Sequence, residues 1–185
     1  MILSTRLAVA FSAASFLGAC ATAPAAVPSS AAAVTSWYGG TMTVTSADGA
    51  TPYGPPKQAL VARTVDAAHD QIVEVVVDDG ALRTTTLQRD AGTNVFRATD
   101  EAKSFTGTVT MTGDGWNISG WSYDLAMADG SGTIAGTATI DAAGIRTEKF
   151  FVAPGGEKKV KIVDGLSPIS HAEYDAQLAG MLKQP

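Results

Sequence analysis

The chain has 185 residues, enough for one domain and a short additional segment, and its formal net charge is −5 at pH 7. A mildly acidic balance argues against binding to nucleic acid and against general binding to anionic lipid surfaces. The single cysteine excludes an intramolecular disulfide and leaves a lone thiol that needs another role.

The first predicted element is an export signal over residues 1–19. Its N-terminal part carries one charge, Arg6, and is followed by an apolar run from Leu7 to Leu17 and then by small residues. The apolar run is about eleven residues long, whereas a helix needs ~20 to cross a bilayer. We therefore expect the segment to direct export and to be cleaved.

The end of this segment, Leu17-Gly18-Ala19-Cys20, resembles the lipobox of bacterial lipoproteins. The resemblance implies cleavage before Cys20 and acylation of its thiol, by a chain such as palmitate, and of its new amino group. Two or three acyl chains hold a protein firmly at a membrane, since each buried methylene contributes about 0.8 kcal/mol. Ala21 stands where an Asp retains lipoproteins at the inner membrane, so the resemblance favours the periplasmic side of the outer membrane over the inner membrane or secretion.

A tether is predicted over residues 20–35. The stretch from Ala21 to Val34 consists almost wholly of Ala, Pro and Ser, and it has no apolar periodicity. Such a composition offers nothing large to bury. We expect it to connect the lipidated Cys20 to a folded domain over residues 36–185.

The folded domain is predicted to be all-β. Short runs of β-branched and aromatic residues alternate with Gly, Asp or Pro clusters about every eight to twelve residues. The clearest strand is Phe105 to Thr112, where apolar residues alternate with threonines. The predicted strands cover residues 37–46, 58–65, 71–77, 81–89, 94–99, 105–112, 116–127, 132–140, 145–152 and 159–163.

The connections between these strands predict antiparallel neighbours. Asp114-Gly115 and Asp129-Gly130 are typical of tight hairpin turns. No segment of crossover length separates any two strands, so a parallel sheet is excluded. We expect an antiparallel up-and-down β-barrel of about 8–10 strands, since closure removes exposed edges, with a β-sandwich as the alternative.

Two local features refine this prediction. Trp116 and Ile118 share one face of their strand, whereas Trp121 and Tyr123 share the other, so a bulge near Gly120 is expected to switch the faces.

Near the C-terminus, Ser170 and Glu173 have the spacing of a capping box. An apolar stripe follows at helical spacing, which predicts one α-helix over about residues 170–182 that packs on the sheet or plugs a barrel end.

The sequence contains no recognisable catalytic or cofactor motif. His69 and His171 are far apart, and no metal-ligand spacing surrounds either, so we expect no metal site and no cofactor. Gly130-Ser131-Gly132 lies in a predicted turn rather than in a nucleophile elbow. The acidic pairs Asp78-Asp79 and Asp100-Glu101 lie at strand ends, where we expect solvated turns. We therefore expect no enzyme, and keep a hydrolase as the third hypothesis.

A second resemblance concerns ligand binding. Thr35-Ser36-Trp37-Tyr38 resembles the Gly-x-Trp opening of lipocalins, with Thr35 in place of the glycine, and the strand meander with a late helix is similar to the lipocalin and fatty-acid-binding barrels. The resemblance implies an apolar small molecule in the barrel and a buried arginine for its carboxylate, with Arg83, Arg97 and Arg146 as candidates. Five aromatic residues are the candidate ligand wall: Trp37, Phe105, Trp121, Tyr123 and Phe150.

The leading hypothesis is therefore an envelope lipoprotein, attached to the membrane by its lipid anchor, that binds an apolar or amphipathic small molecule in a β-barrel. The alternative is a non-enzymatic interaction or assembly lipoprotein, whose barrel core is filled and whose surface meets an envelope protein. Neither hypothesis involves nucleic acid.

Overall fold

A computed structural model of the chain describes residues 32–78 and 80–182. The expected export signal, the lipidation site at Cys20 and most of the expected tether lie outside the described residues. Among the described residues, no helix has the length and apolar character needed to cross a membrane.

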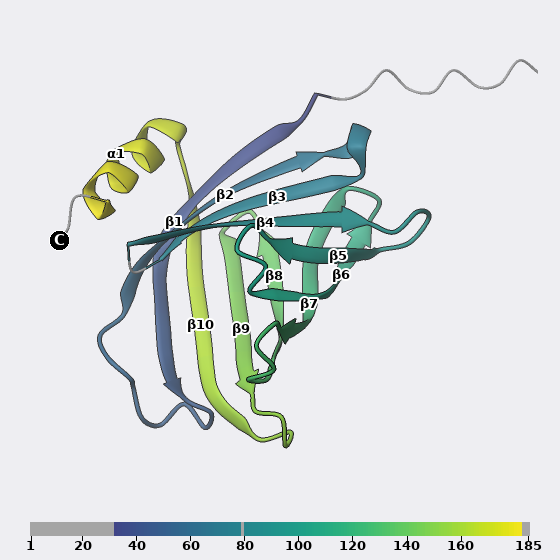
Figure 1. The fold of residues 1–185 in the computed structure, drawn as a ribbon. Coiled ribbons are helices and arrows are strands. Elements are labelled where there is room, and N and C mark those ends of the chain that lie inside the picture. The colour runs from purple at the N-terminus through teal and green to yellow at the C-terminus, as the bar shows by residue number, and fades with distance from the viewer. Residues whose placement is uncertain (1–31, 79, 183–185) are drawn as a thin grey trace, which may run out of the picture.

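The described chain forms a closed barrel of ten antiparallel strands with one C-terminal helix (Figure 1). Each strand pairs with its neighbours in sequence, and β1 pairs with β10 to close the sheet. The first strand begins at Val34, slightly before the expected start of the domain at residue 36. The strands are β1 Val34–Ser46, β2 Lys57–Asp66, β3 Gln71–Asp78, β4 Ala81–Arg89, β5 Val95–Asp100, β6 Phe105–Asp114, β7 Asn117–Met127, β8 Thr133–Asp141, β9 Gly144–Val152 and β10 Lys158–Ile169.

This architecture confirms the up-and-down barrel and rules out the sandwich alternative. The closing pair runs from Trp37 opposite Ile169 to Ser46 opposite Val160. The last strand extends to Ile169, beyond the predicted end at Val163, because it must pair along almost the whole of β1. Closure leaves no unpaired sheet edge along this wall.

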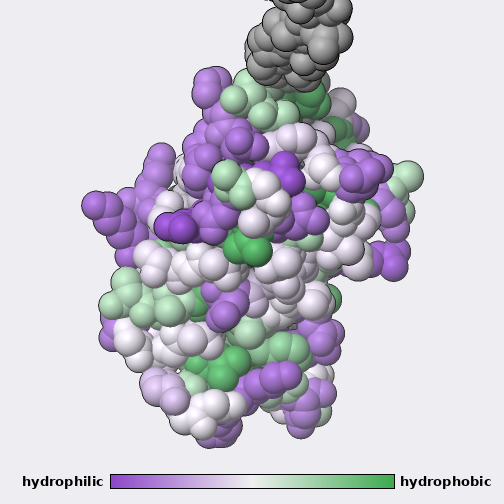
Figure 2. Space-filling view, turned by 90° about the vertical axis from the view of Figure 1, so that its right-hand side faces the viewer, coloured by the Kyte–Doolittle hydropathy of each residue, from purple (hydrophilic) through white to green (hydrophobic). Residues whose placement is uncertain are grey.

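Successive side chains of each strand point alternately into and out of the barrel, and this alternation decides which ones fill the interior. In β6, Val109 and Met111 are buried in the core, whereas Thr110 and Thr112 are exposed. Figure 2 shows one outer face of the molecule, where hydrophobic residues are scattered among hydrophilic ones rather than gathered in a broad patch. The main core is therefore the barrel interior.

The predicted bulge is present in β7. Thr112 pairs with Gly120 and Gly113 pairs with Ile118, so Ser119 is the extra residue on the bulged strand. The bulge lets Ile118 and Trp121 both pack against the interior core, although in a regular strand residues three positions apart would point to opposite faces.

The helix α1 (His171–Met181) packs on the outside of the barrel and does not plug an end (Figure 1). Its capping box is formed, since the Glu173 backbone N–H donates to the Ser170 hydroxyl and the Glu173 carboxylate accepts from the Ser170 backbone N–H. The helix and the outer faces of β2 and β3 bury a second, smaller cluster of side chains: Leu60, Val77, Tyr174 and Met181.

One inward glycine allows two strands to approach closely beside the site described below. A Cβ on Gly136 would lie 2.1 Å from the carbonyl oxygen of Glu148 on β9. Gly136 pairs with Tyr123 in the neighbouring strand β7. The absence of a side chain at position 136 therefore lets β8 and β9 pack closely beside the Tyr123 position.

Candidate functional site

One end of the barrel interior is packed solid. This packed end lies towards the β4–β5 and β6–β7 turns, where Phe96 is only 2% exposed and meets Trp116 edge to face at 5.9 Å between ring centroids. Buried neighbours in the same cluster complete the packing: Ile72, Leu87, Val109 and Met111. No ligand needs to fill this end, because side chains already do.

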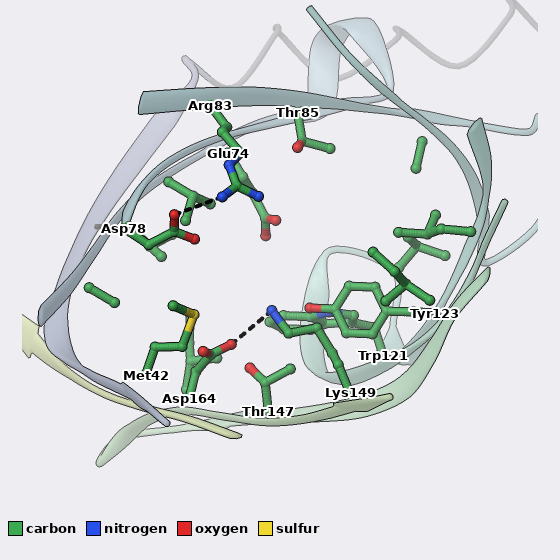
Figure 3. Close-up of a pocket in the computed structure, with 18 of the residues that line it drawn as sticks. Met42, Glu74, Asp78, Arg83, Thr85, Trp121, Tyr123, Thr147, Lys149 and Asp164 are labelled. Carbon is green, nitrogen blue, oxygen red and sulfur yellow. Dashed lines mark hydrogen bonds and ion pairs between the residues drawn. The ribbon is translucent and has the colours of Figure 1, made fainter. Parts of the chain in front are cut away.

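The other end of the interior contains a cavity of about 170 Å³ (Figure 3). Arg83, which lines the cavity, also has a largely exposed side chain, so the cavity reaches water near the β3–β4 turn. We call this the open end. The apolar part of the lining is formed by Met42, Ala59, Val61, Val76, Leu87, Ala98, Phe105, Val109, Trp121, Leu125, Ile134, Ile145 and Leu166.

Two ion pairs lie on opposite walls of the cavity (Figure 3). On β3 and β4, the Arg83 guanidinium Nη2 donates to Asp78 Oδ1 at 2.9 Å. On β9 and β10, Lys149 Nζ lies 2.9 Å from Asp164 Oδ2. The cavity therefore has apolar surfaces for the body of a ligand and charged groups for its polar end.

A third ion pair lies between the cavity and the packed end. The buried Arg63 guanidinium donates to the Glu74 carboxylate, which itself lines the cavity. The Arg63 guanidinium carbon is also 4.5 Å from the centroid of the Trp121 ring, and its Nη2 is 4.0 Å from the Met111 sulfur. The three carboxylates of the cavity are thus each matched by one cation.

Burial changes the acid–base behaviour of two groups on the β7–β9 side. Burial raises the pKa of the Tyr123 phenol to about 12, so this hydroxyl is neutral at physiological pH. Burial also disfavours the Lys149 ammonium, but the negative charge of neighbouring groups, the hydrogen-bonded Asp164 carboxylate among them, outweighs that penalty, and the pKa of Lys149 is raised. Lys149 is therefore a stable cation and a hydrogen-bond donor, not a nucleophilic amine.

The expectation of solvated turns at Asp78 and Asp100 was wrong, because both side chains are buried. Asp100 accepts hydrogen bonds from the backbone N–H groups of Ser104 and Phe105 and from the Ser104 hydroxyl. Burial disfavours its carboxylate, but these hydrogen bonds hold its pKa below the usual value. Asp100 thereby organises the 101–104 turn without lining the cavity, whereas Asp78 is part of the cavity wall.

The structure brings together four of the predicted ligand-binding residues. Each of the following lines the cavity: Phe105, Trp121, Tyr123 and Arg83. Among the predicted arginines, Arg83 faces the cavity, but it is paired with Asp78.

The other four predicted ligand-binding residues do not line the cavity. Trp37 packs beneath α1 and stacks on His171, with ring centroids 4.5 Å apart and an interplanar angle of 16°. Phe150 lies under the Lys158 ammonium, which is 4.0 Å from the ring centroid. Arg97 pairs with Asp90 in solvent and Arg146 is exposed. Each of these four side chains lies on the outer face of the barrel, because the residues directly before and after it in its strand point inward.

Sequence reasoning missed most of the charged residues of the cavity. Glu74 and Asp164 line the cavity, and Arg63 lies next to it and pairs with Glu74. Each of the three is in phase with inward apolar residues of its own strand, as Arg63 is with Val61. The shared phase with inward apolar residues therefore could have indicated that these charged side chains point inward. In β2 it does not distinguish the two faces, because Leu60 on the opposite face is also buried, under α1.

Within residues 32–78 and 80–182, no cluster of three or more His, Cys, Asp or Glu side chains is arranged to hold a metal ion. Comparison with known protein families, with curated proteins and with solved structures found no match for this chain.

Proposed function

We propose that this chain is a non-enzymatic envelope lipoprotein that binds a small apolar or amphipathic molecule inside its barrel. The observation that carries the proposal is the cavity at the open end, where apolar walls and charged groups converge. Ligand sites typically combine such a predominantly apolar lining with a few placed polar groups.

The size of the cavity limits the ligand. An apolar cavity of about 150 Å³ accommodates a single benzene ring. The cavity of about 170 Å³ therefore suits one ring with a short polar arm, and it is too small for a folded long acyl chain. Occupation would remove the apolar walls from water, with a gain of about 25 cal/mol per Å².

Native mass spectrometry of the full chain purified from its host tests this proposal. The expected result is a bound species of low mass that organic extraction releases. Isothermal titration with single-ring compounds should then refill the extracted barrel. A barrel that carries nothing and accepts none of these compounds would contradict the proposal.

The proposed anchor is the acylated Cys20, at the periplasmic side of the outer membrane. Its support is the lipobox resemblance, together with the start of β1 at Val34, after the Ala/Pro/Ser-rich segment. Metabolic labelling with an alkyne analogue of palmitate should mark the wild-type chain but not the Cys20→Ser variant. Recovery of the unlabelled wild-type chain with its N-terminus uncleaved would overturn the anchor.

The second candidate is an interaction or assembly lipoprotein with a scaffold barrel. The solid packing of one end, around Phe96, favours it. In that case, crosslinking in intact cells should recover one dominant envelope protein, and extraction of small molecules should leave this partner bound.

A further inference from the structure

The charged side chains of the cavity differ greatly in their access to water. The Arg83 side chain is 60% exposed, although its partner Asp78 is only 11% exposed. On the opposite wall, Lys149 is 25% exposed and Asp164 is 11% exposed. Among the described charged residues that line the cavity, Arg83 is therefore the one whose charge lies mostly in solvent.

This difference determines which ligand charge the cavity can accept. An anion that took Lys149 from Asp164 would leave a buried carboxylate without a partner, and such a group is costly. Movement of the Arg83 guanidinium away from Asp78 would return a cation to water, where it is well solvated. An incoming cation can then pair with Asp78, and no buried charge is left unmatched.

On this basis, and resting on the small-molecule site proposed above, we propose that the ligand is a small primary amine with an apolar body of about one ring. Its ammonium replaces the Arg83 guanidinium on Asp78. Its body lies against the aromatic and aliphatic walls beyond, and Lys149 stays neutralised by Asp164.

The wall around Asp78 has the hydrogen-bond acceptors that an ammonium requires. An ammonium donates three hydrogen bonds and accepts none. Asp78, Glu74 and the Thr85 hydroxyl all lie on the β3–β4 wall of the cavity (Figure 3). The Trp121 and Tyr123 rings, which also line the cavity, add aromatic surface for the apolar body of the ligand.

Three probes with the same phenylethyl body and different polar ends test the charge preference. Phenethylamine is a cation, phenethyl alcohol is neutral and phenylpropionate is an anion. Isothermal titration on the full chain at neutral pH should show phenethylamine binding at least about tenfold tighter than either of the others, a difference that one charge-assisted pair can supply.

Two variants identify the residues responsible. Arg83→Gln removes the competing cation, so phenethylamine should bind about threefold to tenfold tighter. Asp78→Asn removes the negative charge that pairs with the ammonium, so the amine should lose its advantage over the alcohol, and unchanged alcohol binding shows that the cavity is intact. Arg97→Gln is the matched control, since Arg97 also pairs with an aspartate but lies outside the barrel.

The outcomes separate the two proposals. If the probes bind but phenethylamine has no advantage, or Arg83→Gln weakens its binding, the amine inference is wrong while the small-molecule site stands. If none of the three probes binds, both proposals are overturned. An amine advantage that is lost in Asp78→Asn and kept in Arg97→Gln supports the inference.

Discussion

The two ends of the barrel interior are built by the same ten strands with the same alternation, but one is solid and the other hollow. At the packed end, large side chains such as Phe96 and Met111 converge and meet. At the open end, some inward positions carry small residues, Ala59 and Ala98 among them. The comparison teaches that the alternation of side chains along a strand decides which residues point into the barrel. The size and charge of those residues then decide whether the interior is filled.

The largest expected difference between the ends concerns their aromatic residues. Phe96→Ala should lower the free energy of unfolding by about 3–5 kcal/mol, because it opens a cavity in a fully packed core. Phe105→Ala should cost only about 1–2 kcal/mol, because Phe105 is partly exposed and lines the cavity instead of filling a packed core. Denaturant unfolding of both variants measures the difference, and equal costs would mean that the two ends are packed alike.

The buried pair between the two ends should give the next largest effect. Arg63→Leu leaves the Glu74 carboxylate without its cation, so we expect a loss of about 3 kcal/mol in the free energy of unfolding. The double variant Arg63→Leu/Glu74→Leu should recover most of that loss, since no unpaired charge remains. Additive losses in the double-mutant cycle would argue against this explanation.

Alkaline pH should destabilise the open end through Tyr123. The folded-state pKa of Tyr123 is about 12, above its ordinary value of 10.0. Its contribution is therefore complete below pH ~10, and it is lost as the pH rises towards about 12. Between pH ~9 and pH ~11 we expect Tyr123 to account for a loss of about 1.4 kcal/mol. Tyr123→Phe should make the measured pH dependence shallower, and an unchanged slope would contradict the assignment.

The smallest effect should come from the exposed pair at the mouth. Arg83→Gln should change the free energy of unfolding by less than about 1 kcal/mol, because the Arg83 side chain lies mostly in water. Thermal unfolding checks this value against that of Arg63→Leu. A loss as large as that of Arg63→Leu would mean that Arg83 holds the fold together and is not free to give way to a ligand.

The architecture could be predicted from the sequence because its causes are local. Alternation in β6, tight Asp-Gly turns and the Ser170–Glu173 capping box each depend on residues near in the chain. The change of face in the strand containing Trp121 could likewise be predicted from that strand alone.

The site could be predicted only in part, because whether a side chain points into the barrel or outward depends on segments that lie far away in the sequence. The sequence places Trp37 on the ligand wall, but its ring lies on the outer face of the barrel, where it packs beside α1 and stacks on His171. In β2 both faces carry apolar residues, because α1 packs on the outer one, so the phase that Arg63 shares with Val61 does not tell which face is inward. The pairing of Lys149 with Asp164 depends on the register of β9 against β10, which single strands do not specify.

The junction between β1 and β10 also has a consequence for how the chain acquires its structure. Trp37 can find Ile169 only after nearly every intervening residue has been made and arranged, so ring closure is the most non-local step available to this polypeptide. Until the barrel closes, the two edge strands of the unfinished sheet expose unpaired backbone N–H and C=O groups, with which strands of other chains could pair. Truncation before Lys158 should therefore yield self-associating material instead of a smaller folded domain.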